Sequence, residues 1–171
     1  MGEALARALA SAGATVRTEQ RPGDIGEIIR MHGVLYAAEH GYDVSFEGYV
    51  AKTFAAYLWP LDDRQCLWIV ERDGVWRGSV AIVEVSPAVA QLRWLLLHPE
   101  VRGHGLGKAL VDEALAFCRA NGYASVLLWT EGSLETATTL YRKFGFKRTE
   151  TKTSGIWGAT RTEERYDLSL R

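Results

Sequence analysis

Cysteine is scarce in this sequence of 171 residues, which contains only Cys66 and Cys118. Two cysteines build no disulfide framework, and these two lack the spacing of a metal-binding pair. The net charge is only −1 at pH 7, which argues against a nucleic acid or an anionic membrane surface as a partner attracted by bulk charge. No apolar run reaches the length that crosses a bilayer. These absences point to an ordinary globular protein.

The first residues also lack targeting signals. Glu3 and Arg7 interrupt the apolar core that a secretion signal needs. Ala6 stands where the myristoylation pattern requires Ser or Thr. We therefore expect a cytoplasmic protein with no membrane and no nucleic-acid partner.

Length and composition fit a single folding unit. Hydrophobic residues make up 47% of the chain and charged residues 24%, and both values are ordinary for a globular domain with its own core. Residues 2–12 are rich in alanine and predict a short helix. This helix is either an arm that packs on a neighbour or a frayed terminus. We expect an N-terminal helical arm over residues 1–14 and one domain over residues 15–171.

The most informative stretch is residues 97–108, which read LHPEVRGHGLGK. An apolar run over 92–97 stops at Pro99 and is followed by Gly103, Gly105 and Gly107, after which a helical pattern begins. Glycines let the backbone approach a phosphate closely, and the unpaired N–H groups of a first helical turn attract anions. A strand, a glycine turn and a helix start in this order predict an anion-binding loop. The alternative, a plain tight turn, does not need three alternating glycines.

Two common phosphate-binding loops are excluded by spacing. A Walker loop has four residues between its glycines and ends in Gly-Lys-Ser/Thr, whereas Ala109 follows Lys108 here. A dinucleotide fingerprint needs Gly-x-Gly-x-x-Gly, and here the third glycine comes one position early. The loop is therefore of another kind.

The pattern Arg102-x-x-Gly105-x-Gly107 resembles the acetyl-CoA pyrophosphate signature of the GNAT superfamily of N-acetyltransferases. The run LLLHPEVRGHGLGKAL is similar to the fourth strand, loop and third helix of that family, and LYRKFGF over 140–146 is similar to the end of its fourth helix. Residues 21–43 also resemble GNAT domains that are often fused to MarR-type regulators, through His32, Gly33, Leu35, Tyr36 and Glu39.

The expected elements follow the GNAT order. We predict an α/β (α+β) fold, with a mixed seven-stranded sheet that splays between its fourth and fifth strands and is flanked by four helices. The expected strands span 15–20, 67–71, 75–85, 89–97, 125–130, 146–153 and 162–170, the last two around a loop rich in Gly and Thr. The expected helices span about 24–41, with Asp24 as its cap, then 46–58, 104–121 and 134–144.

The resemblance implies acetyl-CoA as cosubstrate and no metal. Backbone N–H groups of the loop would hold the pyrophosphate, with side-chain charge from Arg102 and Lys108; a solvated helix face is the alternative for Lys108. His104 is read as exposed and not catalytic. The pantetheine arm would pair with the strand backbone at Leu95, Leu96 and Leu97, where an N–H near Leu97 would polarise the thioester carbonyl. The full set of expected cofactor contacts is Leu95, Leu96, Leu97, Arg102, Gly103, His104, Gly105, Leu106, Gly107 and Lys108.

At the reacting centre, Tyr141 matches the helix-4 tyrosine that GNAT enzymes place near the thioester sulfur, so it is the expected general acid. A core aromatic is the alternative. One departure is Leu134, which stands where the family often has an Asn that contacts pantetheine. The expected base is Glu84 or Glu131. Glu84 closes the expected strand 75–85 on the same face as Ile82 and Val80, where a carboxylate is unexpected, and Glu131 follows the expected strand 125–130, close to where the sheet splays. For each, a solvated surface role stays open.

Acceptor contacts are expected from His32, Tyr36 and Glu39, because the first two helices form the acceptor wall in GNAT folds. His32, Glu39 and His40 could also be drawn as a metal site by helical spacing, but no fourth ligand is evident. Aromatic residues gather on the acceptor side, and core or dimer surface is the alternative reading for most of them: Tyr36, Tyr42, Tyr49, Trp59 and Trp157.

The sequence thus predicts an acetyl-CoA-dependent N-acetyltransferase that acts on the primary amine of a small molecule. Transfer is expected to be direct, in a ternary complex, because no cysteine is placed to form an acyl intermediate. The alternatives are a protein or peptide amine as acceptor, and an acyl-CoA-binding sensor without turnover. A homodimer is left open.

Overall fold

The computed structural model describes residues 1–57 and 62–170. Within them lie five α-helices, which are α1 (Glu3–Ala12), α2 (Asp24–His40), α3 (Val44–Tyr57), α4 (Leu106–Ala120) and α5 (Glu135–Lys143), and a short 3-10 helix over Pro99–Val101. The strands are β1 (Thr15–Arg17), β2 (Cys66–Arg72), β3 (Val75–Ser86), β4 (Val89–Leu97), β5 (Ser125–Glu131), β6 (Lys147–Ile156) and β7 (Ala159–Ser169). They form one mixed sheet in the order β1-β2-β3-β4-β5-β7-β6, which confirms the predicted fold class.

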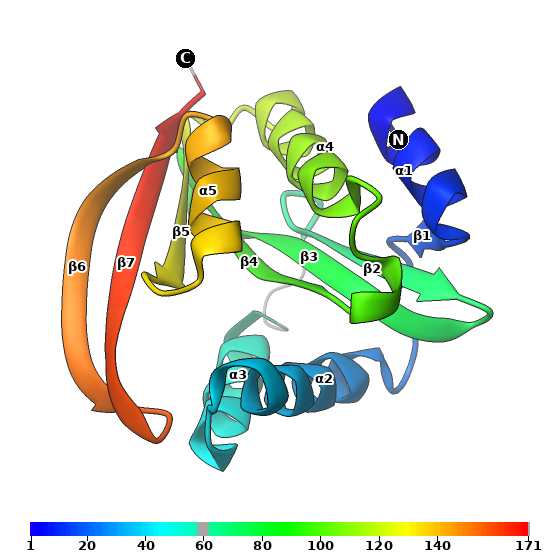
Figure 1. Ribbon diagram of the computed structural model, residues 1–171. Helices are drawn as coiled ribbons and strands as arrows, with labels where there is room; N and C mark the ends of the chain where they lie inside the picture. Colours follow the sequence, from blue (N-terminus) through cyan, green and yellow to red (C-terminus); the bar gives the residue numbers. More distant parts are fainter. Residues whose placement is uncertain (58–61, 171) are drawn as a thin grey trace.

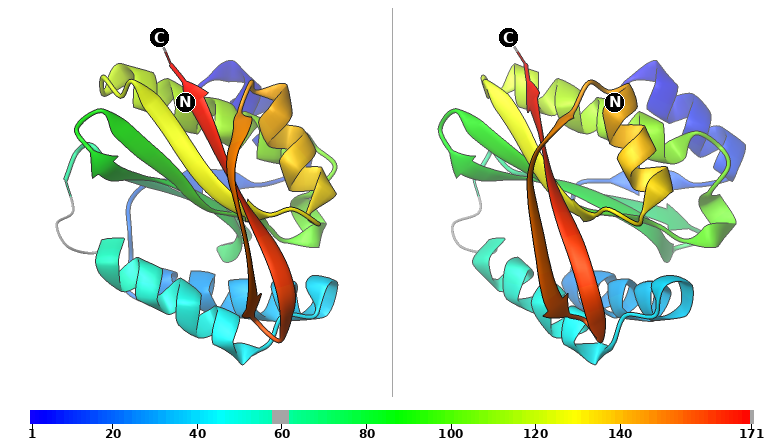
Figure 2. Two further views of the ribbon diagram at one scale, coloured as in Figure 1. Left: turned by 90° about the vertical axis from the view of Figure 1, so that its left-hand side faces the viewer. Right: turned by 60° about the vertical axis from the view of Figure 1, so that its left-hand side comes forward.

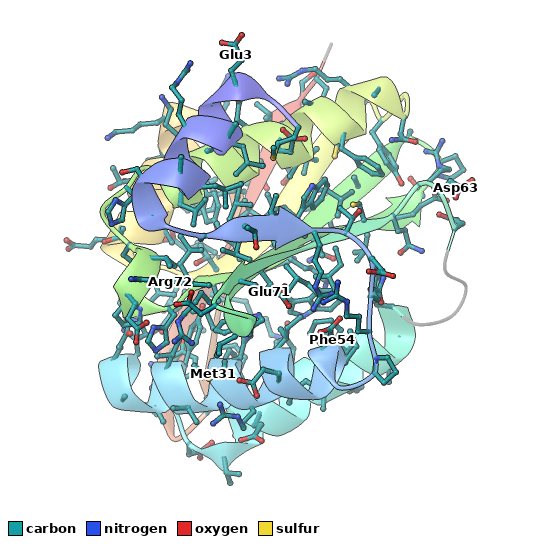
Figure 3. All side chains as sticks on the ribbon, turned by 90° about the vertical axis from the view of Figure 1, so that its right-hand side faces the viewer. Glu3, Met31, Phe54, Asp63, Glu71 and Arg72 are labelled. Carbon is teal, nitrogen blue, oxygen red and sulfur yellow. The ribbon has the colours of Figure 1, made fainter. Side chains whose placement is uncertain are left out.

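The sheet is a central layer between two helical layers (Figure 1). Helices α1, α4 and α5 lie on one face, and α2 and α3 lie on the other. Residues 80–83 of β3 are buried without interruption, because both faces of the strand are covered. Val80 and Ile82 pack toward α4, whereas Ala81 and Val83 pack toward α2 and α3. Figure 3 shows Phe54 of α3 between the sheet and the lower helices.

Strands β4 and β5 separate after a short parallel stretch. They pair only from Val89 to Gln91, opposite Ser125 to Leu127. Further along, β4 carries a bulge: Arg93 lies opposite Ala81, the register then shifts, and Leu96 lies opposite Ser79. Trp94 sits in the bulge with φ of 50°, a backbone conformation that a β-bulge can impose on a strand. The predicted splay between the fourth and fifth strands is therefore present.

The last two strands differ from the prediction. The expected Gly- and Thr-rich loop between them is wrong: β6 and β7 run on through it and meet at a two-residue turn, Trp157–Gly158. Both turn residues have positive φ, 50° and 87°, as a type I′ hairpin requires. Threonines favour the extended backbone, so the polar run forms strand. The long hairpin reaches down to the α2–α3 layer (Figure 2).

Other boundaries shift slightly. Gly23, with φ of 98°, occupies the N-cap of α2. The Asp24 carboxylate accepts hydrogen bonds from Arg17 instead of capping the helix, at 2.7 and 2.8 Å. The predicted end of the second helix at 58–60 lies outside the described residues. Helix α4 begins at Leu106, two residues later than predicted.

Helix α1 packs against α4 of the same chain. Its buried face consists of Leu5, Ala8, Leu9 and Ala12, and these side chains join the cluster around α4. The backbone N–H of Gly2 donates to the Glu113 carboxylate at 2.7 Å. In the described ranges, no helix combines the length and the apolar character needed to cross a membrane.

Candidate functional site

A pocket of about 700 Å³ opens where β4 and β5 separate. Its walls come from β4, the end of β5, α2, α3, the loop before α4, α5 and the β6–β7 hairpin. The glycine loop borders it at Arg102 and Gly103, and Trp157 and Glu163 of the hairpin also line it. The split sheet thus creates one continuous space between the predicted cofactor loop and the predicted acceptor wall.

The glycine loop presents free backbone donors. Gly103 and Gly105 have φ of 83° and 74°, a conformation that strains other residues. The first hydrogen bond of α4 runs from Ala109 N to Gly105 O at 3.0 Å. Within the described part of the chain, no acceptor contacts the N–H groups of residues 103–108. A Cβ built on Gly103 or Gly105 meets nothing within 4 Å, so space for an anion lies beside these donors.

The side chains of the loop have different partners. Arg102 binds both carboxylate oxygens of Glu39 on α2, at 2.9 and 3.0 Å, and its Nε donates to Leu97 O at 2.8 Å. His104 is exposed and lies 2.9 Å from Ser11 Oγ on α1. Lys108 is exposed. Arg102 therefore links the loop to the acceptor wall, while Lys108 faces solvent beside the free N–H groups.

The edge of β4 that faces the gap carries free backbone groups. His98 N donates to Arg77 O of the neighbouring strand at 2.8 Å. Because backbone groups alternate along a strand, the N–H of Leu97 points the other way, toward the gap. The Leu97 carbonyl, in contrast, is occupied, because it accepts a hydrogen bond from Arg102 Nε. Leu95, Leu96 and Leu97 all line the pocket.

Tyr141 of α5 reaches the pocket from the opposite wall. The residue is buried, with 6% of its surface exposed. Burial raises the pKa of its phenol above the usual value of 10, and Tyr36 adds to this rise. The phenol therefore stays protonated, and able to donate, across the physiological pH range. Leu134, the residue before α5, also lines the pocket.

The two carboxylates predicted as bases have different positions. Glu84 does not line the pocket: it lies opposite Ala90, in the stretch where β4 still pairs with β5 and the sheet is not yet split. Its carboxylate is bound by Arg64, and Tyr123 Oη lies 3.3 Å away. The carboxylate on this apolar strand face is explained by its ion pair with Arg64. The structure therefore does not place Glu84 where a catalytic base would have to lie. The sequence alone could not show that Arg64, 20 residues before Glu84, contacts it in the fold.

Glu131, in contrast, lies in the pocket wall and is 8% exposed. It accepts hydrogen bonds from the Tyr42 hydroxyl and from Arg161 Nη1, the latter at 3.1 Å. Arg161 also lies over the Tyr42 ring, 3.8 Å from its centroid. Glu131 thus links the segment between α2 and α3 to β7 at the pocket.

Glu163 is a carboxylate that sequence reasoning missed. It faces Glu131 across the β5–β7 pairing and lines the pocket. In the described structure it forms no ion pair within 4 Å, although Lys152 is its cross-strand neighbour. Burial raises the pKa of Glu163, Lys152 opposes the rise and Glu131 adds to it. Glu163 lies in the pocket wall because the β5–β7 register places it opposite Glu131. This register cannot be read from the sequence.

Helix α2 contributes His32, Tyr36 and Glu39 to the pocket, as predicted. His32 Nδ1 lies 2.8 Å from Ile28 O, and since a carbonyl only accepts, Nδ1 carries the proton. Burial lowers the pKa of His32 to about 4, so the ring is neutral at pH 7. Burial likewise raises the pKa of Tyr36 to about 12.

These side chains do not form a metal site. The Glu39 carboxylate forms an ion pair with Arg102, and the Nδ1 of His32 donates a hydrogen bond to the Ile28 carbonyl. Across residues 1–57 and 62–170, no group of three or more His, Cys, Asp and Glu side chains is placed to hold a metal ion.

An aromatic cluster closes the far side of the pocket. Tyr42 stacks on Trp157 with ring centroids 5.1 Å apart, and Tyr36 and Phe46 lie 4.6 Å apart. Tyr49, which is 39% exposed, lies 5.3 Å from Trp157. Of the predicted aromatics, Trp59 lies outside the described residues. The hairpin turn therefore completes a wall that α2 and α3 begin.

Neither cysteine belongs to the pocket lining. Cys118 is buried on α4 and Cys66 is half-buried on β2. Burial raises the pKa of each thiol to about 12. At neutral pH both remain thiols, the weak nucleophilic form.

Comparisons with known proteins agree with this geometry. Residues 34–146 match the profile of the acetyltransferase (GNAT) family. An uncharacterized N-acetyltransferase of Schizosaccharomyces pombe is 34% identical over 118 residues, which are 67% of this chain and 72% of that protein. Human N-acetyltransferase 8B is 35% identical over 97 residues, 54% of this chain. The chain spans only 43% of the length of that human relative.

Solved structures share the fold. A GNAT family acetyltransferase from Elizabethkingia anophelis, determined with acetyl-CoA bound, superposes with a TM-score of 0.64 at 13% identity. The superposition covers 92% of this chain and 99% of that one.

Proposed function

The chain belongs to the acetyltransferase (GNAT) family, and we propose that it transfers an acetyl group from acetyl-CoA to the primary amine of a small molecule. The observation that carries this proposal is the pocket at the β4–β5 split. It joins a phosphate-binding type of loop, an open strand edge and the Tyr141 phenol in one space.

The residues present fit acetyl-CoA. The free N–H groups of residues 103–108 and the exposed Lys108 suit a pyrophosphate, and each hydrogen bond to such a charged group contributes roughly 1.5–3 kcal/mol. The open edge of β4 from Leu95 to Leu97 suits the amide groups of a pantetheine arm.

Acetyl-CoA supplies the acetyl group as a thioester: the amine nitrogen forms a bond to the carbonyl carbon, and the bond from that carbon to sulfur breaks. The Leu97 N–H, which faces the gap, polarises the carbonyl as a one-donor oxyanion hole. A single donor of this kind contributes on the order of 3 kcal/mol to the transition state. The strand edge performs this role without any particular side chain.

The amine must lose a proton before it can attack. For an amine with a pKa near 10.4, exposing the free base at pH 7 costs roughly 4–5 kcal/mol. Glu163 is our choice of base, because it lines the pocket without an ion pair and burial raises its pKa. Glu131 is the alternative; its carboxylate already accepts from Tyr42 and Arg161.

Tyr141 acts on the leaving group. Its protonated phenol donates to the CoA sulfur as the bond to carbon breaks, and the second proton that the acylated nitrogen releases restores the phenol. Positioned acids of this kind contribute about 10²- to 10⁴-fold. Transfer is direct, in a ternary complex, since both cysteines lie away from the pocket and remain thiols.

The walls of the pocket favour a small acceptor. The aromatic side chains of α2 and α3 and the turn of the β6–β7 hairpin bound the space beyond the reacting centre. A protein or peptide amine would need an open groove there. Retention of Tyr141 in the pocket favours turnover over a sensor that only binds acyl-CoA.

Free-thiol release from acetyl-CoA with a panel of amines tests this function. We expect Tyr141→Phe to lower kcat about 10²- to 10⁴-fold, while calorimetry shows the Kd for acetyl-CoA nearly unchanged. Tyr123→Phe is the matched control, since Tyr123 is a buried tyrosine away from the pocket. An unchanged rate in Tyr141→Phe would remove this residue from the mechanism. Acetyl-CoA binding with no thiol release from any amine would replace the enzyme with a sensor.

A further inference from the structure

One cation in the pocket wall has no partner. Arg93 of β4 is half-buried and lines the pocket. Among the residues that the structure describes, no carboxylate lies within 4 Å of its guanidinium and no hydrogen bond reaches it. Its nearest charge-related contact is the Trp94 ring, 5.8 Å from Cζ to the centroid. A half-buried guanidinium without a counter-charge is unusual, because desolvating a charge is costly unless it is paired.

The register of the sheet directs Arg93 toward the acceptor side. Arg93 lies opposite Ala81, and paired residues share a face of the sheet. Ala81 packs in the cluster under α2 and α3, so Arg93 points to that layer. Arg102, the other arginine of the pocket lining, is held by Glu39.

Acetyl-CoA does not account for this charge. Its phosphates belong at residues 103–108, and its pantetheine arm, at Leu95 to Leu97, carries no anionic group. Arg93 precedes Leu97 by four residues, roughly 13 Å along an extended strand. The cation therefore belongs to the end of the pocket where the acceptor binds.

A second unpaired charge, of opposite sign, lines the same pocket. Glu163 on β7 forms no ion pair within the described ranges. The carboxylates of Glu39 and Glu131 are instead held by arginines. Two strands on opposite sides of the split thus present a guanidinium and a carboxylate without ion pairs, Arg93 and Glu163. Glu135 also lines the pocket without an ion pair among the described residues, but it is exposed at the start of α5.

We propose that the acceptor is an amine that also carries a carboxylate, of the α-amino acid class, with its carboxylate bound by Arg93 and its amine directed to Glu163. This proposal rests on the acetyl-transfer function above and names its substrate class. The planar guanidinium matches a carboxylate with two parallel hydrogen bonds. The aromatic wall around Tyr36, Phe46 and Trp157 would receive an apolar amino-acid side chain.

Matched pairs of acceptors test the proposal. Rates of thiol release are compared for L-phenylalanine and 2-phenylethylamine, L-leucine and 3-methylbutylamine, and L-methionine and 3-methylthiopropylamine. We expect kcat/KM to favour the amino acid of at least one pair by about 10- to 100-fold. Arg93→Gln should remove that preference by slowing the amino acid alone, and Arg93→Lys should retain part of it. Arg119→Gln, at an exposed arginine on α4, is the control for net charge.

A binding measurement makes the test independent of turnover. N-acetyl-L-phenylalanine, the corresponding product, keeps the carboxylate and lacks a basic amine. By calorimetry it should bind the wild type about 10- to 100-fold more tightly than Arg93→Gln.

Three outcomes would overturn the proposal. The first is acetylation of simple amines with no higher kcat/KM for any amino acid. The second is that Arg93→Gln lowers kcat/KM equally for the amino acid and the amine of a pair. The third is that no amino acid is acetylated at all. The first of them leaves the acetyltransferase function standing. If no amine of any kind releases thiol, the function itself fails.

Discussion

His32 shows how one buried side chain can make the fold sensitive to pH. The ring lies on α2 in the pocket wall, with its protonated Nδ1 donating to Ile28 O. Burial lowers its pKa from 6.5 to about 4. Between these values the unfolded chain binds more protons than the folded one. The stabilisation from neutral His32 is therefore fully present above pH 6.5 and is lost as the pH falls toward 4.

We expect this effect to reach about 3 kcal/mol in the free energy of unfolding. His32→Asn keeps an N–H donor for the Ile28 carbonyl but does not titrate. The difference in stability between wild type and His32→Asn should therefore shift by that amount between pH 7 and pH 4, measured by urea unfolding. His104→Asn, at an exposed position, should show no such shift. A constant difference for His32→Asn across this range would contradict a buried neutral ring.

Glu163 makes a kinetic prediction. Its raised pKa places the acidic limb of kcat/KM above pH 4.5, because activity is lost as the base protonates. Glu163→Gln should lower kcat/KM at pH 7 by about 10²- to 10³-fold and remove that limb. Glu131→Gln, which disturbs Tyr42 and Arg161, should keep it. If the limb survives in Glu163→Gln and vanishes in Glu131→Gln, Glu131 is the base.

The sequence located some of these residues and could not locate others. That Tyr141 and the loop after β4 lie at one pocket was predictable because both belong to short motifs with a family spacing, and their roles stay predictions. Glu84 was misplaced because a carboxylate on an apolar face signals an ion pair as well as a base, and its partner Arg64 comes from a separate segment. Arg93 and Glu163 became visible only with the β4 bulge and the β5–β7 register.

At the scale of elements, we propose that the glycine loop and α4 act as one anion-binding unit. Gly103 and Gly105 take the positive φ that aims N–H groups at a ligand. Gly107 acts differently, since a Cβ there would touch Leu97 Cδ1 at 3.6 Å. This is an ordinary van der Waals distance, so neither packing on β4 nor a positive φ requires glycine at position 107.

Gly105→Val tests the binding role of this unit. The side chain would occupy the space beside the free N–H groups and strain a backbone with φ of 74°. We expect the Kd for CoA to rise at least 10-fold by calorimetry, from the loss of one charged hydrogen bond or more. Gly122→Val is the matched control, because Gly122 has φ of 75° at the opposite end of α4. Both variants should lose about 1–3 kcal/mol of stability, but Gly122→Val should bind CoA normally.

Strand and helix boundaries followed from local signals where these were strong. The predicted span of β4 matches the structure, since Pro87 and Pro99 flank an apolar run. The last two strands were predicted, but their extension through residues 154–161 was missed, because a run rich in Gly and Thr is typical of a loop. The two-residue turn at Trp157–Gly158 keeps the flanking residues paired, so they form strand.

On the scale of the whole molecule, the pocket depends on two separate apolar clusters. One holds α1, α4 and α5 against the sheet, and the other holds α2 and α3. The cofactor loop belongs to the first layer and the acceptor wall to the second, with the Arg102–Glu39 ion pair between them. A phosphate that binds at the loop, or an acceptor that binds at α2, would therefore contact a residue of this ion pair or its neighbours, so each layer would be affected by a ligand bound to the other.

The central claim is that the split between β4 and β5 holds acetyl-CoA with its pyrophosphate on the loop before α4. A crystal structure of the chain with CoA tests it most directly. We predict pyrophosphate density within hydrogen-bonding distance of the N–H groups of residues 103–108, and the pantetheine arm beside β4 at Leu95 to Leu97, facing Tyr141. CoA bound elsewhere, or a loop left empty at saturating CoA, would contradict the account.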